Sequence, residues 1–135
     1  MTTSQLDRAD CMRLLARSTF GRIGITVGAL PVVLPVNYRL VDDHIVFRTG
    51  QGTKLDAATR NSIVAFQVDD IDPLSHSGWS VMVTGEAREV TDVGDLADLE
   101  AAGIPHWVHS EDDATMAVAT TMVTGRRVGD APPAG

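Results

Sequence analysis

Apolar and polar residues alternate along the segment 20–27, with Ile23 and Ile25 on one side and Arg22 on the other. Because successive side chains of a strand point to opposite faces, this alternation predicts a strand with one buried face. The same reasoning predicts six strands, at residues 20–27, 31–41, 45–48, 62–68, 79–90 and 115–123. In the second of these, Pro35 has no N–H to donate to a ladder, which predicts an edge position or a bulge.

Three short segments show helical periodicity, at residues 7–18, 55–61 and 92–102, the last with Thr91 or Asp92 as its cap. Hairpin-like connections join most strands, and the absence of a β-α-β rhythm excludes a doubly wound sheet. The pattern therefore predicts a mainly β protein, a closed six-stranded antiparallel barrel with flanking helices. At 135 residues it is expected to be one domain, 1–135, with a disordered tail at 128–135.

The acidic net charge of the chain disfavours two classes of binding partner. The formal net charge is −7 and the isoelectric point is near 4.8. Nucleic acids and anionic membrane surfaces both select a basic footprint, so neither is an expected partner. No apolar run approaches the ~20 residues of a spanning helix, and the polar start MTTSQLDRAD favours a cytoplasmic protein. The single cysteine, Cys11, excludes an intrachain disulfide framework and is interpreted as a small core residue.

A glycine-containing turn at residues 47–55, FRTGQGTKL, carries the clearest chemical signal. Arg48 precedes the turn, and Lys54, the single lysine of the chain, follows it. Gly52 lets the backbone approach an anion, and Thr49 and Thr53 offer hydroxyl donors beside the start of a helix. The spacing is not that of a P-loop. It fits a phosphate-binding site and a solvated turn with Thr53 as the helix N-cap equally well.

Other polar residues give weaker signals. His106 and His109 have the spacing of helical metal ligands, but Pro105 and the lack of a third ligand nearby favour an exposed loop. The residues interpreted as solvated surface are Asp69, Asp70 and Asp72 in an acidic loop, and His44 and His76 in turns. No metal site is therefore expected.

Four segments in consistent order, GRIGI, LPVNYRL, FRTGQGTKLDAATRN and SGWSVMVTGEAREVTD, resemble the pyridoxamine 5'-phosphate oxidase-like flavin-binding split-barrel family. The resemblance runs from about residue 6 to residue 127. It implies a six-stranded split barrel that forms a homodimer, with FMN bound at two sites between the subunits. The pyridoxamine oxidases proper carry a C-terminal motif with Arg and His for the substrate phosphate, which the tail GDAPPAG lacks, so synthesis of pyridoxal 5'-phosphate is not expected.

The resemblance also implies roles for particular residues. The FMN phosphate would be held by Arg48, Thr49, Thr53 and Lys54. The backbone of Pro35, Val36 and Asn37 would lie against the isoalloxazine ring. Trp79 and Ser80 would come from the partner subunit, and Arg126 or Arg127 would contact either the flavin or the partner chain. For this last pair, a basic strand end that pairs with aspartates is an equal alternative.

Two functions follow as hypotheses. The first is an FMN-dependent oxidoreductase that acts on an undetermined small molecule, with the redox chemistry supplied by the cofactor. The second is a non-catalytic carrier or sensor of a flavin, a deazaflavin coenzyme or haem on the same fold. The scarcity of lysine favours FMN over a deazaflavin with a polyglutamate tail, and no residue stands out as a general acid or base.

Overall fold

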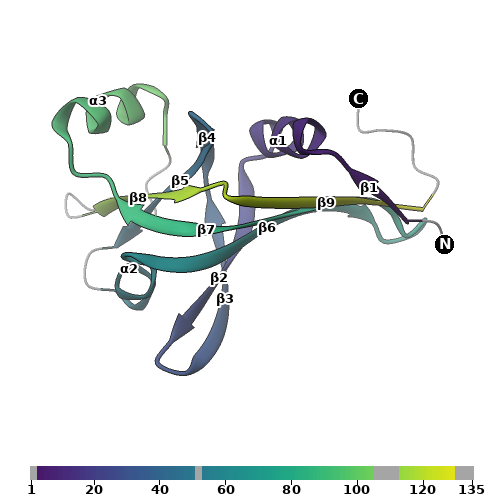
Figure 1. Cartoon of the computed structure of the whole chain (residues 1–135), viewed down its shortest axis with the longest axis horizontal. Coiled ribbons are helices and arrows are strands. Elements are labelled where there is room, and N and C mark those ends of the chain that lie inside the picture. Colours follow the sequence, from purple (N-terminus) through teal and green to yellow (C-terminus); the bar gives the residue numbers. More distant parts are fainter. Residues whose placement is uncertain (1–2, 51–52, 105–112, 130–135) are drawn as a thin grey trace.

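The computed structural model describes residues 3–50, 53–104 and 113–129, and within these ranges the chain forms nine strands and three helices (Figure 1). The strands are β1 (Thr3–Leu6), β2 (Phe20–Val27), β3 (Leu30–Asn37), β4 (Arg39–Val41), β5 (His44–Gly50), β6 (Ser62–Asp72), β7 (Ser77–Glu89), β8 (Asp113–Ala119) and β9 (Met122–Val128). The helices are α1 (Arg8–Arg17), α2 (Lys54–Thr59) and α3 (Val93–Ala101). Every strand pair is antiparallel, and the sheet curls into a half-barrel with the order β3-β2-β6-β7-β8-β5-β4. β9 lies between β7 and β1.

The two ends of this strand order, β3 and β4, are consecutive in the chain and are joined through Tyr38. β3 pairs with β2 and β4 pairs with β5, so the single strand predicted at 31–41 is two strands. At the bend, the Tyr38 amide donates a hydrogen bond to the Thr19 carbonyl at 3.0 Å. The edge position predicted from Pro35 is confirmed, since among the described residues β3 pairs with β2 alone.

The sheet divides at Gly85, where β7 changes partner. The first part of β7 pairs with β9 as far as Thr84 opposite Met122, and its last part pairs with β8. A Cβ on Gly85 would lie 1.8 Å from the carbonyl oxygen of Ala119, so the crossing of the two backbones requires glycine. The last strand predicted at 115–123 is therefore divided into β8 and β9, which pair with different parts of β7.

Helix α1 is fastened to the sheet through Tyr38. Its N-cap is Asp7, whose side chain accepts from the Asp10 amide, and its buried face carries Cys11, Leu14 and Leu15. The carbonyls of the last helical turn have no partner within the helix. The phenol of Tyr38 donates to one of them, the Leu15 carbonyl, at 2.7 Å. Burial raises the pKa of Tyr38 to about 12.

Some segments differ from the predictions. The acidic residues 69–72 belong to strand β6, because the β6–β7 hairpin continues to Asp72 opposite Ser77. Strand β1 was not predicted, and it gains its partner only through β9, at the other end of the chain. The division of two predicted strands and the addition of β1 raise the strand count from six to nine without altering the class of fold. Among the described residues, no helix has the length and apolar character that crossing a bilayer requires.

On β3, β2, β6, β9 and the part of β7 that pairs with β9, no helix among the described residues packs on the outward side of the sheet, whereas α3 packs on that side at β5 and β8. The side chains of α1 and α2 join the interior core with the inward residues of the strands, such as Ile23, Phe66 and Val83. On the opposite side, a row of cross-strand neighbours runs through Val33, Gly24, Ala65, Thr84 and Met122. A second row runs through Pro35, Arg22, Gln67, Met82 and Thr124. We call this side of β3, β2, β6, β7 and β9 the open face.

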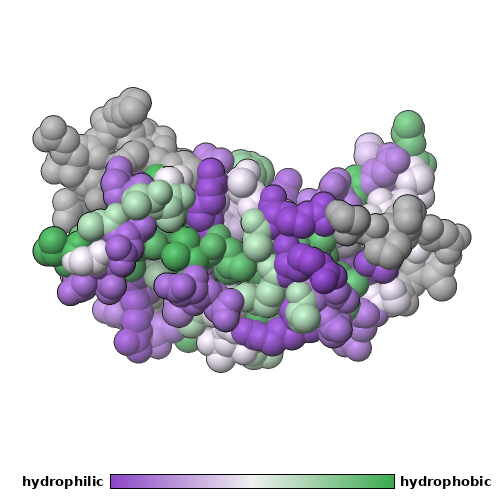
Figure 2. All heavy atoms as spheres, turned by 90° about the horizontal axis from the view of Figure 1, so that it is seen from above, coloured by the Kyte–Doolittle hydropathy of each residue, from purple (hydrophilic) through white to green (hydrophobic). Residues whose placement is uncertain are grey.

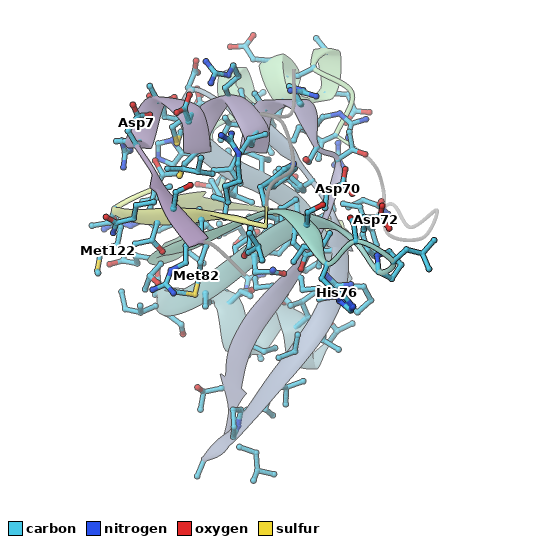
Figure 3. All side chains as sticks on the ribbon, turned by 90° about the vertical axis from the view of Figure 1, so that its right-hand side faces the viewer. Asp7, Asp70, Asp72, His76, Met82 and Met122 are labelled. Atoms are coloured by element: carbon cyan, nitrogen blue, oxygen red, sulfur yellow. The ribbon has the colours of Figure 1, made fainter. Side chains whose placement is uncertain are left out.

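Large apolar side chains of the open face remain exposed to solvent. Val33 and Ile63 are each 67% exposed, Met122 is 62% exposed and Met82 is 46% exposed. Met82 and Met122 lie on the same side of the sheet, away from Asp70 and Asp72 (Figure 3). A row of uncovered aliphatic and thioether side chains across neighbouring strands is typical of a surface that meets another molecule.

Candidate functional site

The glycine turn is held by Thr53, which is the N-cap of α2. The Thr53 hydroxyl donates to the Gly50 carbonyl at 2.6 Å and accepts from the Asp56 amide at 3.2 Å. Of the two interpretations of the turn, Thr53 as the helix N-cap is therefore confirmed, and phosphate binding stays a prediction. Gly52 and the side chain of Lys54 lie outside the described residues.

Thr49 and Arg48 are neighbours in β5 but point to opposite faces of the strand. The buried hydroxyl of Thr49 donates to Oδ1 of Asp56 at 3.0 Å, on the α2 side. Arg48 reaches the α3 side, where Nε donates to the Ile104 carbonyl at 3.3 Å and the guanidinium pairs with Glu100. The structure therefore does not bring Arg48 together with Thr49 and Thr53, as the expected phosphate clamp requires.

An ion-pair network fixes α2 beside the turn. The buried carboxylate of Asp56 accepts from Arg60 at 3.0 Å and 3.2 Å, and Arg60 also pairs with Glu89 of β7. The hydrogen bond with Glu89, followed by that with Asp56, raises the pKa of Arg60 above its ordinary value. Thr49, Asp56 and Arg60 thus tie β5 and α2 to the end of β7.

Four of the expected site residues are collected on the open face. Pro35 and Asn37 are exposed residues of β3, and Ser80 lies directly opposite Arg126 across β7 and β9. Ser80 and Arg126, with Met82, Thr124 and Gly125, line a pocket of about 230 Å³. The pocket combines a thioether, two hydroxyls and a guanidinium, which are groups that can contact a flat heteroaromatic ring and an anion.

Polar residues that no sequence pattern indicated lie beside Ser80 at the edge of this pocket. Gln67 of β6 donates from Nε2 to Oδ2 of Asp69 at 2.7 Å and to the Ser80 hydroxyl at 3.4 Å. Arg22 of β2 lies 4.0 Å from the same Asp69 carboxylate. Only the pairing of β2, β6 and β7 brings these residues together, so no local pattern could have revealed them.

Val36 and Trp79 point to the interior instead. Val36 is 1% exposed and Trp79 is 8% exposed, and both belong to the interior core. Trp79 and Ser80 are consecutive in β7, so their side chains occupy opposite faces of the sheet. In this chain Ser80 faces the open side, whereas Trp79 packs beneath it with Val81 and Val83.

The remaining candidates take structural positions. Cys11 is fully buried, and its Sγ would lie 2.5 Å from a Cβ on Gly125, so the thiol fills the space that this glycine leaves. Burial raises the pKa of Cys11, which opposes formation of a thiolate. The carboxylate of Asp72 accepts from the Leu74 amide at 2.9 Å, which lowers its pKa. No group of three metal-ligating side chains occurs among the described residues, and His106 and His109 fall outside them.

The curled antiparallel sheet, divided where β7 changes partner, defines a split-barrel class of protein. The chain belongs to the pyridoxamine 5'-phosphate oxidase family, whose model matches residues 7–128. The protein Rv0080 of Mycobacterium tuberculosis is 40% identical over 129 residues, which are 92% of this chain and 84% of that protein.

Solved structures extend this comparison. The FAD binding protein from Mycobacterium smegmatis is 36% identical with a TM-score of 0.84, and the match covers 95% of this chain and all of that one. The FAD and heme binding protein from the same organism has a TM-score of 0.74 at 16% identity, covering 100% of this chain and 77% of that one. The second likeness concerns the fold alone.

Proposed function

We propose that this protein binds a flavin nucleotide at the open face of a homodimer and uses it for electron transfer with a small molecule. The observation that carries the proposal is the likeness, over 95% of this chain and at 36% identity, to a protein described as FAD-binding. That description supports FAD as the first form to test. FMN, the form that the resemblance in the sequence implies, is the second.

The residues of the open face fit a flavin chemically. Met82 offers an apolar contact for a ring, Ser80 and Gln67 offer hydrogen-bonding groups for its polar edge, and Arg126 offers a cation for a phosphate. Bound flavin would supply hydride or single-electron transfer, while the protein orients the ring and excludes water. Arg126 has no ion pair among the described residues, so its charge is available for an anion.

The size of the pocket supports a site shared by two subunits. Its volume of about 230 Å³ is below the roughly 300–1,000 Å³ of typical ligand pockets. A second wall is therefore needed to enclose a flavin. The exposed Met82 and Met122 at the pocket, and Val33 farther along the open face on β3, are apolar surface that a second copy would cover in an isologous contact.

The decisive experiment is cofactor identification in the purified protein, followed by titration. Bands near about 375 and 450 nm, together with submicromolar binding of FAD or FMN, would support the proposal. Riboflavin serves as the probe that lacks phosphate. A Soret band with no flavin absorbance would favour the haem carrier instead. If neither flavin nucleotide binds at concentrations up to 100-fold above the protein, in a sample that light scattering shows to be dimeric, the proposal is wrong.

A further inference from the structure

We propose that a groove along β8, on the side of the sheet that carries α3, binds a small organic cation with an apolar body. Two adjoining pockets of about 270 Å³ and 420 Å³ form this groove. They share His44, Val90 and Ala117, so they are parts of one depression. We call it the β8 groove. It lies beside β5 and β8, whereas the pocket proposed for the flavin lies on β7 and β9.

The floor of the groove consists of two alanines. Ala117 and Ala119 of β8 are half-buried, while their neighbours Met116 and Val118 point into the interior core. Ala117 lies between Val46 of β5 and Arg88 of β7. Small residues between larger neighbours on adjacent strands leave a trough that a leucine at either position would fill.

The walls near α3 are apolar. Val41, Val46, Val90 and Leu99 line the smaller pocket, and they belong to a second hydrophobic cluster between α3 and the sheet. Seen from above the view of Figure 1, where α3 and α1 lie, a hydrophobic area is visible between these two helices (Figure 2). The contacts of Arg48 with Glu100 and with the Ile104 carbonyl hold the end of α3 against β5. The groove is therefore built between fixed elements, with apolar surface available to a ligand.

The rim of the groove selects for positive charge. Asp42, Asp95 and Asp98 surround the smaller pocket, and none of them has an ion-pair partner among the described residues. In the larger pocket, the carboxylate of Glu86 is already paired with Arg88 at 2.7 Å. An anionic ligand would meet three uncompensated carboxylates, whereas an ammonium group would be attracted to them.

His44 offers a ligand in the groove a hydrogen-bonding group, and its side chain lines both pockets. Its Nδ1 lies 2.8 Å from the Asp42 carbonyl, which can only accept, so Nδ1 carries the hydrogen. In the neutral imidazole Nε2 is then the acceptor, which is the group that an ammonium N–H requires. The apolar floor, the unpaired carboxylates and this acceptor together define an amine with an aliphatic or aromatic body.

The test compares two probes of similar shape and opposite charge, 4-phenylbutylamine and 4-phenylbutyrate. Binding to the full-length protein is followed by amide chemical-shift changes and by calorimetry. We expect the amine to bind at least about tenfold more tightly, with shifts centred on Val46, Ala117 and Ala119, and to weaken as salt is raised. Equal binding of the two probes, or shifts centred elsewhere, would overturn the proposal.

Two kinds of variant distinguish the contribution of the alanine floor to binding from that of the carboxylates. Ala117→Leu should abolish binding of the amine, and the pair Asp95→Asn and Asp98→Asn should weaken it about two- to fivefold, since these carboxylates are exposed. Asp70→Asn, which removes a carboxylate on the distant β6–β7 hairpin, is the matched control and should change nothing. Ala119→Leu replaces Ala117→Leu if that variant does not fold.

Flavin titration and light scattering accompany each variant as independent measurements. If a folded Ala117→Leu variant binds the amine as tightly as the natural protein, the groove is not a ligand site of this kind, and Ala119→Leu takes its place where Ala117→Leu changes the oligomeric state. Because the groove is separate from the Ser80–Arg126 pocket, failure of this proposal leaves flavin binding unaffected, and the reverse also holds.

Discussion

The guanidinium of Arg48, at the end of β5, pairs with the carboxylate of Glu100 in α3, 52 residues further along the chain. Arg48 is 9% exposed and also donates to the Ile104 carbonyl. The carboxylate of Glu100 is largely exposed, so the buried hydrogen bond contributes more to stability than the ion pair does. Arg48 is thus a structural link between the sheet and α3, whatever its contact with a cofactor.

We therefore expect Arg48→Ala to lower the free energy of unfolding by about 1–3 kcal/mol, because it leaves a buried carbonyl without its donor. Glu100→Gln should cost less than about 1 kcal/mol. Urea denaturation of both variants without cofactor measures this difference. If Arg48→Ala is as stable as the natural protein but loses flavin affinity, Arg48 is a cofactor ligand and its structural role is minor.

Lys54→Ala tests the phosphate contact that the family resemblance implies, and Arg126→Ala tests the phosphate contact proposed for the open face. Each should weaken binding of FAD and FMN by about 1–3 kcal/mol, the range for loss of a charge-assisted hydrogen bond. Riboflavin has no phosphate, so its affinity should stay within about twofold. Arg13→Ala, on the exposed side of α1, is the control. Fluorescence titration measures the affinity for each flavin. If the variants lose as much affinity for riboflavin as for FAD and FMN, these residues contact the isoalloxazine ring and not the phosphate.

Met82→Asp combined with Met122→Asp tests the open face as a subunit interface. Both side chains are exposed in the single chain and lie on neighbouring strands of that face (Figure 3). Burying two carboxylates in an apolar contact is unfavourable, so the variant should be monomeric and should lose flavin binding. Val93→Asp, on exposed α3, should remain dimeric. Sedimentation measures both, and a dimeric double variant with normal flavin content would contradict the shared site.

Gly85→Ala tests the point at which the sheet divides. The added methyl would meet the Ala119 carbonyl at 1.8 Å, and backbone must move to accept it. We expect a loss of more than about 3 kcal/mol of stability, or no folded protein. At Gly24 the same change meets Ala65 at 3.6 Å, an ordinary contact, and circular dichroism should show a normally folded protein. Similar melting temperatures for the two variants would contradict the requirement for glycine at this crossing.

The raised pKa of Tyr38 makes the stability of the folded chain depend on pH in the alkaline range. Its pKa is about 12 in the folded chain against an ordinary value near 10, so the unfolded chain loses this proton first. The contribution to stability is complete below about pH 10 and is lost as the pH rises through about 12. Tyr38→Phe should flatten the stability profile in this window. It should also cost about 0.5–1.5 kcal/mol at pH 7, because the Leu15 carbonyl loses its donor.

Local patterns were sufficient for most of the elements. Strand β2 spans the predicted residues, and α1 and α3 begin after their capping residues Asp7 and Asp92. Period-two alternation along the strand predicted at 79–90 puts Trp79 and Val81 on one face and Ser80 on the other, and the structure buries Trp79 and Val81 while Ser80 faces the open side. Helix caps and the alternation of strand side chains depend on residues that are close together in the sequence, which is why the sequence alone determined them.

Only the tertiary structure decided where the candidate site residues meet. The spacing of the glycine turn suggested that Arg48 and Thr49 act together, but the pleat of β5 sends them to α3 and α2 respectively. Ser80 and Arg126 share a pocket because β7 pairs with β9, and Gln67 joins them because β6 pairs with β7 on the other side. Strand register and the fold of the sheet set these contacts between residues far apart in the chain. A pattern of neighbours along the sequence carries no information about them.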